Sequence, residues 1–158
     1  MTKHYLITAL LAMIPISEVR GAIPYGYFNG IPMANVVVLS MLMNMMVPLI
    51  GFAFLNTFHK IFMKWPFYEK LIGKLIDKAR NKVGEKVHRY GYFGLTVFVA
   101  IPLPVTGAWT GVLGAWVLGL NVRKSIPAII LGVAIATAIV TTVILTGSGL
   151  VNIFTKHF

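Results

Sequence analysis

The sequence has 158 residues, of which 58% are hydrophobic and only 11% are charged, and its mean hydropathy is +0.83. These values exceed those of ordinary soluble domains and predict an integral membrane protein. The net charge of +10 would suggest a nucleic-acid partner in a soluble protein, but most Lys and Arg lie within residues 60–89, and no nucleic-acid-binding motif accompanies them. We therefore expect no nucleic-acid partner. The absence of cysteine excludes disulfides and thiolate chemistry.

The N-terminal segment is apolar but too short to cross a membrane. As a helix, Tyr5–Ile16 would reach about 18 Å, whereas the hydrocarbon core needs about 20 residues. The next block, Ala22–Ile31, is equally short and contains Pro and Gly. We therefore predict a re-entrant helical hairpin that turns at Ser17–Gly21 and is sheltered at its tip by protein or water. Lys3 and the apolar run after it imitate a signal peptide, but no small-residue cleavage site follows, so we expect the segment to be retained.

Two charged residues, Glu18 and Arg20, lie at this predicted turn between apolar stretches. An ionisable residue at bilayer depth costs about 2.5–3.5 kcal/mol on insertion scales, and it persists where it pairs or lines a polar cavity. Both residues are therefore candidates for substrate binding. Glu18 is the one acidic residue outside residues 59–91 and is also a candidate for proton coupling. The alternative is an ion pair that only stabilises the fold.

A full membrane span is predicted next, at Met33–Leu55. The segment is mostly apolar and long enough to cross the bilayer. Pro48 interrupts its backbone hydrogen bonds, so one face should pack on protein. Asn35 and Asn44 are expected to form hydrogen bonds between helices rather than to bind a ligand.

Residues 59–91 differ in composition from both flanking regions and form a basic linker. Apolar residues recur there at helical spacing, and lysines recur on another face at nearly regular four-residue intervals. The pattern predicts an amphipathic helix in the membrane interface, on the cytoplasmic side because basic residues mark that side. A solvated cytoplasmic helix is the alternative. The predicted membrane-surface residues are Lys70, Lys74, Lys78, Lys82, Lys86, Arg123 and Lys124.

The second half of the chain repeats the order of the first. A short apolar block, Phe93–Leu103, precedes a turn rich in Pro, Thr and Gly and a second short block that ends at Gly119. A polar step, Asn121–Ser125, separates this second predicted hairpin from a full span at Ile126–Leu145. Three matched residue pairs support an internal repeat: Ile14-Pro15 with Ile101-Pro102, Gly21-Ala22 with Gly107-Ala108, and Gly30-Ile31 with Gly119-Leu120.

Each repeat crosses the membrane once, so the second must be inserted upside down relative to the first. The predicted fold class is an all-α integral membrane protein, with an inverted repeat of re-entrant helical hairpin plus transmembrane helix joined by the amphipathic linker helix. The single membrane domain, 1–158, comprises repeat 1 (1–58), the linker (59–91), repeat 2 (92–147) and a short tail (148–158). With the linker in the cytoplasm, this multi-pass protein of the cell membrane has both termini on the opposite side, and the hairpin tips meet near the midplane.

The two hairpin tips form the predicted substrate site. Helix N-termini present unpaired N–H groups and a positive dipole, which favour anions. In the first hairpin the outgoing helix is expected to begin at Gly21–Pro24, and in the second Thr106 is the candidate N-cap. Together with Arg20, these N-termini would bind a phosphate or carboxylate. The predicted substrate-binding residues are Glu18, Arg20, Gly21, Pro24, Pro102, Pro104, Thr106, Gly107, Trp109 and Thr110.

Other residues near the tips have competing explanations. Trp109 either stacks on substrate or fills the interface between the hairpins. Gly111, Gly114 and Gly119 are expected to allow close helix packing rather than to bind a ligand. The histidines lie near the termini or in the linker, too dispersed for a cluster, so we predict no metal site and no cofactor.

Two stretches carry a family resemblance. They are Ser17-Glu-Val-Arg-Gly-Ala-Ile-Pro-Tyr-Gly, and Tyr92-Phe-Gly with Ala100-Ile-Pro-Leu-Pro-Val-Thr-Gly-Ala-Trp-Thr-Gly-Val-Leu-Gly-Ala. They resemble the two signature regions of the small multidrug export protein family, over nearly the whole chain. That family is similar to the DedA/VTT superfamily, whose members have paired re-entrant hairpins and are implicated in lipid transport. The resemblance implies a transporter or flippase, and the family label implies drug export. The second hairpin lacks the further acidic residues found around DedA-type hairpins.

We predict a small secondary transporter or lipid flippase that moves an amphipathic, anionic or phosphate-bearing substrate between the tips, with proton coupling through Glu18 as one mechanism. One alternative is a multidrug exporter of cationic amphipathic compounds, which would bind at Glu18. Another is a non-transporting membrane protein whose basic helix recruits partners or anionic lipid. We expect no enzyme, because Glu18 has no second acid, His or metal partner in the apolar regions. The expected partners are membrane lipids and further copies of the chain, in a homodimer or larger homo-oligomer.

Overall fold

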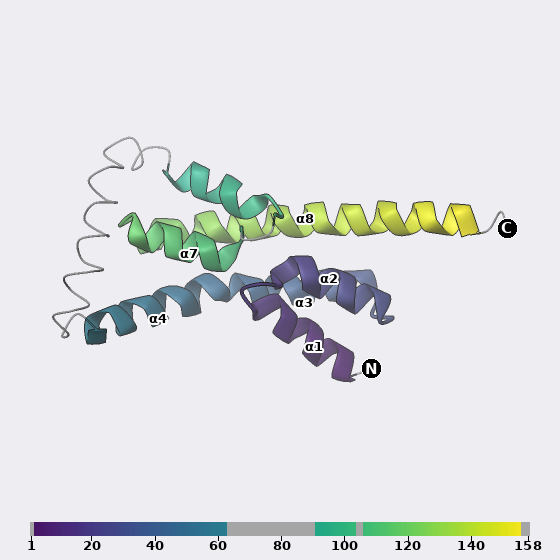
Figure 1. The fold of residues 1–158 in the computed structure, drawn as a ribbon, viewed down its shortest axis with the longest axis horizontal. Helices are drawn as coiled ribbons and strands as arrows, with labels where there is room; N and C mark the ends of the chain where they lie inside the picture. The colour runs from purple at the N-terminus through teal and green to yellow at the C-terminus, as the bar shows by residue number, and fades with distance from the viewer. Residues whose placement is uncertain (1, 63–90, 104–105, 156–158) are drawn as a thin grey trace.

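The computed structural model describes residues 2–62, 91–103 and 106–155, and in these residues the fold is all-helical. The predicted linker helix and its lysines lie outside the described residues. The helices, shown in Figure 1, are α1 (Thr2–Met13), α2 (Glu18–Phe28), α3 (Met33–Met45), α4 (Val47–Phe62), the helix Gly91–Ala100, α7 (Ala108–Val117) and α8 (Val122–Thr155).

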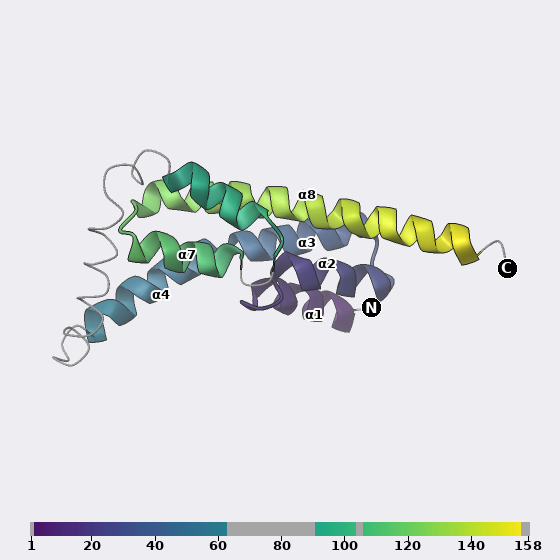
Figure 2. The same ribbon diagram turned by 45° about the horizontal axis from the view of Figure 1, so that its top comes forward.

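The helices form two short pairs and two long rods. In the first helix pair, α1 packs against α2, and in the second helix pair the helix Gly91–Ala100 is followed by α7. The rod of α3 and α4 runs along the molecule in one direction and α8 runs back in the other, so that both chain ends lie at the same end of the molecule (Figure 1). The loops that close the two pairs both lie near the middle of the molecule, as Figure 2 also shows. The re-entrant insertion of these pairs into a bilayer stays a prediction.

Two helical segments are long and apolar enough to cross a membrane. They are Met33–Phe58 and Val122–Gly147, each 26 residues long. The first is broken between α3 and α4 at Met46, two residues before Pro48. Pro48 has no N–H to donate to the carbonyl of Asn44, and its ring crowds that carbonyl, so the predicted interruption of this span has its expected cause.

Helix α8 begins at Val122 rather than at Ile126. The predicted polar step at residues 121–125 is therefore wrong as a separate element, because most of it forms the first turn of the helix. The physical reason is a cap: the side-chain oxygen Oδ1 of Asn121 accepts a hydrogen bond from the N–H of Arg123 at 2.9 Å. Arg123 and Lys124 are exposed in this first turn.

Helix α2 also begins earlier than its sequence predicts. The turn lies at residues 14–17, where the N–H of Glu18 donates to the carbonyl of Ile14 at 3.1 Å. The helix starts at Glu18, so the predicted turn at Ser17–Gly21 and the predicted helix start at Gly21–Pro24 are wrong. Pro24 lies inside the helix instead. A proline there leaves the carbonyl of Arg20 without its usual helical donor, which weakens the first turn of α2.

Two of the three matched residue pairs have the same local structure. Gly30 and Gly119 both adopt positive φ values, 83° and 68°, at the C-terminus of a short helix. The next N–H, from Ile31 or Leu120, donates back to the helix at 3.1 or 2.9 Å, as in a Schellman C-cap. Ile14 and Ile101 each continue the backbone hydrogen bonding of the helix before the turn. The third pair differs, because Gly21 lies inside α2. The inverted insertion of the two repeats stays a prediction.

The core lies where α4, α7 and α8 meet. Phe52, Val112 and Ile129 are buried there. Gly51 allows close approach of α4 to α7, since a Cβ on it would lie 3.1 Å from a methyl carbon of Val112. Many large apolar side chains elsewhere are exposed, Leu131 and Val143 on α8 among them. Such a surface is typical of a helical protein surrounded by lipid.

Candidate functional site

The two helix pairs are joined by the carboxylate of Glu18. One oxygen, Oε2, accepts a hydrogen bond from the backbone N–H of Ala108 at 3.2 Å, and the other, Oε1, accepts from the N–H of Trp109 at 3.2 Å. Glu18 is 3% exposed. These N–H groups belong to the first turn of α7. The N–H groups of a first turn have no acceptor within their own helix. A charge from the first pair thus stabilises the N-terminus of a helix in the second.

Gly107 makes the space for this contact. It precedes α7 with a φ of 153°, and a Cβ placed on it would lie 2.0 Å from Oε2 of Glu18. Only a glycine fits without displacing the carboxylate. Thr106 is not the N-cap that the sequence predicts. Its hydroxyl oxygen lies 2.6 Å from the carbonyl oxygen of Ile101 and 2.9 Å from that of Leu103, so its single proton is donated within its own loop.

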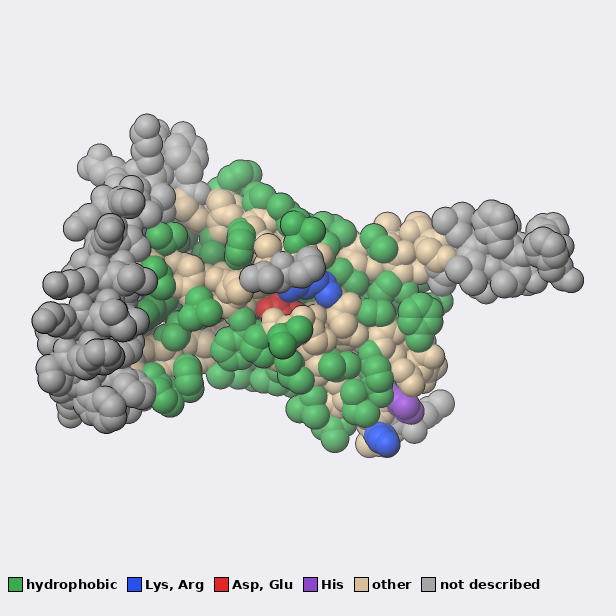
Figure 3. Space-filling model, in the orientation of Figure 1, with side chains coloured by type: hydrophobic (Ala, Val, Ile, Leu, Met, Phe, Trp, Pro, Cys, Tyr) green, Lys and Arg blue, Asp and Glu red, His purple; other side chains and the backbone are tan. Residues whose placement is uncertain are grey.

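Arg20 lies beside Glu18 and reaches the same loop. Its Nη2 is 3.5 Å from Oε2 of Glu18 and donates a hydrogen bond to the backbone carbonyl of Thr106. Its other terminal nitrogen, Nη1, is buried and has no hydrogen-bond partner in the part of the chain that the structure describes. Figure 3 shows the acidic and basic surfaces side by side near the middle of the molecule, among hydrophobic and uncharged surfaces.

The predicted binding site for a phosphate or carboxylate at the two tips is therefore partly occupied by the protein itself. The sequence predicts that the free N–H groups of the second tip bind a phosphate or carboxylate, whereas two of them already bind the carboxylate of Glu18. Among the described residues of this contact, Nη1 of Arg20 is a buried donor that still lacks a partner. A ligand that needed the N–H groups would first have to displace Glu18.

Trp109 fills the interface between the pairs. Its indole Nε1 donates to the carbonyl of Met13, the last residue of α1, at 2.8 Å, and its side chain is half-buried. The carbonyls at the end of a helix have no donors within it, so this bond satisfies one of them. Of the two explanations for Trp109, the geometry supports the interface.

The other predicted site residues lie at different distances from this contact. Thr110 is the third residue of α7, and its hydroxyl donates to the carbonyl of Gly107 at 3.2 Å. Pro102 is half-buried in the loop of the second pair, and Pro104 lies outside the described residues. Gly21 faces the hydroxyl of Ser17, which lies 2.1 Å from where a Cβ would be placed. Pro24 is inside α2, away from the first turn.

Helix α3 contributes buried polar groups that the sequence identified only in part. Nδ2 of Asn44 donates to the carbonyl of Ala12 at 2.8 Å and Nδ2 of Asn35 to the hydroxyl of Tyr5 at 3.1 Å, so both predicted interhelical bonds are confirmed. Ser40, one turn before Asn44, is fully buried, and its hydroxyl has no partner among the described residues. Ser40 lies four residues before Asn44 and so on the same face of the helix, which is the feature of the sequence that could have predicted its burial.

The three glycines expected to allow close packing differ from one another. A Cβ on Gly111 would lie 2.7 Å from a methyl carbon of Val99, so the prediction is confirmed there. Gly119 is needed for its positive φ at the end of α7 instead. For Gly114 the prediction is wrong, because a Cβ would meet nothing within 4 Å.

A family model described as "Putative small multi-drug export protein" matches residues 18–139, which is most of the chain and begins at Glu18. No curated protein and no solved structure matches the chain.

Proposed function

Because the chain belongs to the small multi-drug export protein family, we propose that it is a membrane transporter that exports amphipathic compounds through a site where its two helix pairs meet. The observation that carries this proposal is the buried contact of Glu18 and Arg20 with the loop and first turn of the second pair. Charged groups are retained at apolar depth where they serve a transport path. Secondary transporters place such groups between broken helices near the midplane.

The charges of the site favour a substrate with an anionic or hydrogen-bond-accepting head. Both carboxylate oxygens of Glu18 already accept hydrogen bonds, whereas Nη1 of Arg20 is a buried donor without a partner in the described residues. A phosphate or carboxylate would satisfy that donor with a charge-assisted hydrogen bond. A cationic compound would have to compete with Arg20 for Glu18. The family's description supports export of varied compounds, and a phosphate-bearing lipid is the second candidate substrate because of Arg20.

Passage of a substrate requires the contact between the pairs to open and close. Protonation of Glu18 would remove its charge and break its ion pair with Arg20. The protonated oxygen would also be a weaker acceptor for the N–H group of α7 that it now binds. Proton binding would thus loosen the two pairs from each other. We propose that Glu18 couples proton movement to this opening. A Glu18→Gln variant whose transport keeps its pH dependence would contradict the coupling.

The test of the proposed function is transport by the purified protein in lipid vesicles with an imposed proton gradient. The substrates offered are an anionic amphipathic dye, a cationic one and a fluorescent phosphate-bearing lipid. We expect movement of the anionic compounds, abolished by Arg20→Gln and retained in Arg123→Gln, which removes an exposed charge in α8. Movement of the cationic dye alone, unaffected by Arg20→Gln, would contradict the charge preference. No movement of any substrate would favour the non-transporting alternative, in which the basic linker recruits partners or anionic lipid.

The assembly and surroundings of the transporter are part of the same proposal. Two long helices and two short pairs leave the polar contact thinly covered, and apolar side chains such as Leu42 and Leu49 are exposed on α3 and α4. We propose that membrane lipids and a second copy of the chain cover these surfaces. A single monomeric species, both in mild detergent and in membrane extracts, would contradict the homo-oligomer.

A further inference from the structure

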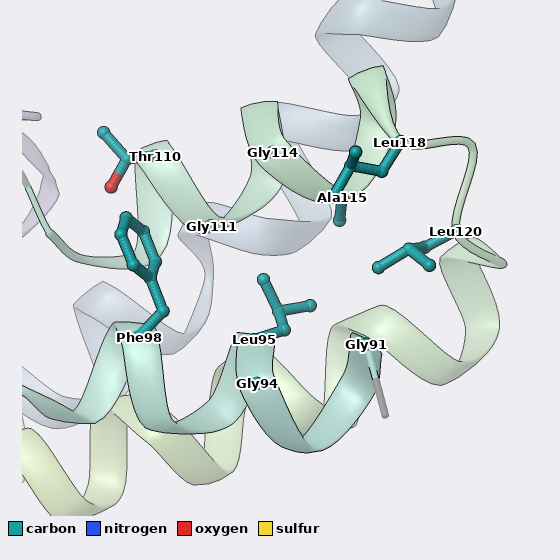
Figure 4. A pocket seen from close by; sticks show the side chains of 10 residues that line it. All are labelled: Gly91, Gly94, Leu95, Phe98, Thr110, Gly111, Gly114, Ala115, Leu118 and Leu120. Carbon is teal, nitrogen blue, oxygen red and sulfur yellow. The ribbon is translucent and has the colours of Figure 1, made fainter. Parts of the chain in front are cut away.

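The helices of the second helix pair line a partly open apolar pocket of about 570 Å³, which none of the polar contacts described above occupies. Figure 4 shows Leu95 and Phe98 of the helix Gly91–Ala100 facing Thr110 and Ala115 of α7 across it. The volume falls within the range of small-molecule sites, about 300–1,000 Å³. The hydroxyl of Thr110 already donates to the carbonyl of Gly107, so the lining offers a ligand mainly hydrocarbon contacts.

Glycines create this space. Gly94 and Gly114 lie on opposite walls within helices, and a Cβ on either would meet nothing within 4 Å. Glycine destabilises a helix interior relative to alanine, so a glycine that neither packs closely nor needs a positive φ is unexplained by the fold. Gly111 and Gly132 show the contrast, because a Cβ on either would lie 2.7 Å from Val99. The missing side chains at positions 94 and 114 keep the pocket open instead.

We propose that this pocket holds the hydrocarbon tail of an amphipathic ligand whose polar head lies at Arg20. The inference rests on the proposed export function and adds a substrate class to it: molecules with one anionic or accepting head and one linear apolar tail. The pocket follows α7 from Thr110 to Leu118, a length of about 12 Å at 1.5 Å per residue, which suits an extended chain rather than a compact ring system.

The position of the pocket relative to the charged contact supports a two-part site. Thr110 lines the pocket at the end nearer the loop, and it is bonded to Gly107, whose backbone lies against the carboxylate of Glu18. Phe98 lines the same end and lies eight residues before Thr106, whose carbonyl binds Arg20. A tail in the pocket therefore ends close to the loop that Arg20 contacts. In the proposed two-part site, one ligand molecule places its head at Arg20 and its tail along α7.

The test uses an alkyl phosphate with a photoreactive diazirine at the end of its tail, bound to the full-length protein in lipid nanodiscs. Cross-linked residues are mapped by mass spectrometry. We expect labels on the residues at the far end of the pocket, Leu118 and Leu120. Gly114→Leu fills the pocket from α7, and Gly94→Leu fills it from the other wall. We expect about tenfold weaker labelling in each, because losing about two buried methylene groups lowers affinity by that factor.

A matched control separates filling the pocket from replacing a helical glycine. Gly147 in α8 also has nothing within 4 Å of a Cβ but does not line the pocket, so Gly147→Leu should label like the unmodified protein. Labelling that survives both Gly94→Leu and Gly114→Leu would overturn the proposal. A bulk lipid tail is the other source of hydrocarbon. If labelling is unchanged in Arg20→Gln, or equal for a probe without a charged head, the pocket holds bulk lipid and the two-part site is wrong.

The outcome is distinguishable from that of the proposed function. Transport abolished by Arg20→Gln but unaffected by Gly94→Leu and Gly114→Leu would leave the exporter in place and remove the tail site. Head-dependent labelling without transport of any substrate would keep the tail site and remove the exporter.

Discussion

At the scale of single residues, the contact between the helix pairs depends most directly on Gly107. Its φ of 153° and the 2.0 Å between an added Cβ and Glu18 Oε2 oppose any side chain there. We expect Gly107→Ala to destabilise the protein by about 1–3 kcal/mol from backbone strain alone, with a further loss from the displaced carboxylate. Denaturant unfolding in mixed micelles, followed by circular dichroism, measures the change.

The control for this prediction is Gly147→Ala. Gly147 lies in α8, has an open Cβ position and does not have a positive φ, so alanine there should stabilise the helix by about 0.5–1 kcal/mol. The two glycine-to-alanine changes should therefore have opposite signs. If Gly107→Ala were as harmless as Gly147→Ala, the close approach of Glu18 to the loop would be refuted.

The carboxylate of Glu18 allows a second prediction. In Glu18→Gln the amide oxygen can still accept from one N–H of α7, but the amide nitrogen then faces the other N–H, donor against donor. Losing one hydrogen bond to a charged group should destabilise the protein by about 1.5–3 kcal/mol. Arg20 would also lose its counter-ion, so the double variant with Arg20→Gln should lose less than the sum of the single losses. Additive losses in this double-mutant cycle would show that the ion pair contributes no coupling.

The residues of this site can be predicted from the sequence, but their partners cannot. Glu18 and Arg20 are conspicuous because charges are rare in the apolar segments, and Gly107 because it follows Thr106 in a predicted turn. The bond from Glu18 to Ala108 joins residues 90 positions apart. No local pattern specifies such a contact, since it depends on how two loops meet in space. The N–H groups of α7 were therefore assigned to a ligand, when an internal carboxylate already satisfies two of them.

At the scale of helices, Trp109 joins α7 to the end of α1 by a hydrogen bond from its indole to the carbonyl of Met13. Trp109→Phe keeps an aromatic ring in the interface but removes the indole N–H. The carbonyl of Met13 then loses its donor beside a half-buried side chain. We expect a loss of about 1–3 kcal/mol, the cost of leaving a buried acceptor unsatisfied. Trp116→Phe is the control, because the bond from its Nε1 to Oδ1 of Asn56, 3.2 Å long, is exposed and water can replace it. Equal losses in the two variants would contradict the role of Trp109 in joining the pairs.

Helix lengths were predicted better than helix boundaries. The two long apolar segments and the short ones between them follow from counting residues against the thickness of a bilayer. The starts of α2 and α8 were placed three or four residues late, at Gly21 and Ile126 instead of Glu18 and Val122. For α2, Pro24 was given too much weight as a helix start, since it lies inside the helix. For α8, the polar residues 121–125 were taken as a separate step, although Val122 already begins the helix, and Pro127 also lies inside it. Membrane-protein helices tolerate an internal proline where neighbouring groups accept the freed carbonyl.

At the scale of the whole molecule, the start of α1 and the end of α8 lie toward the same end of the molecule, and the helix ends that flank the basic linker lie toward the other (Figure 1). The sequence predicts one full span per repeat, and a chain with an odd number of crossings on each side of the linker would have this arrangement. If the two rods span the bilayer, residues near the two chain ends must face the same side. The linker must face the other.

The sequence itself makes this topology easy to measure, because the protein has no cysteine. Single cysteines at the exposed positions Thr2 and Thr146, and at Asn81 in the linker, introduce one labelling site each. In intact cells a membrane-impermeant maleimide should label Thr2→Cys and Thr146→Cys but not Asn81→Cys, because basic segments stay in the cytoplasm. Permeabilised cells provide the control in which all three react. Labelling of Asn81→Cys from outside would reverse the orientation, and labels on Thr2→Cys and Thr146→Cys from opposite sides would rule out the inverted repeat.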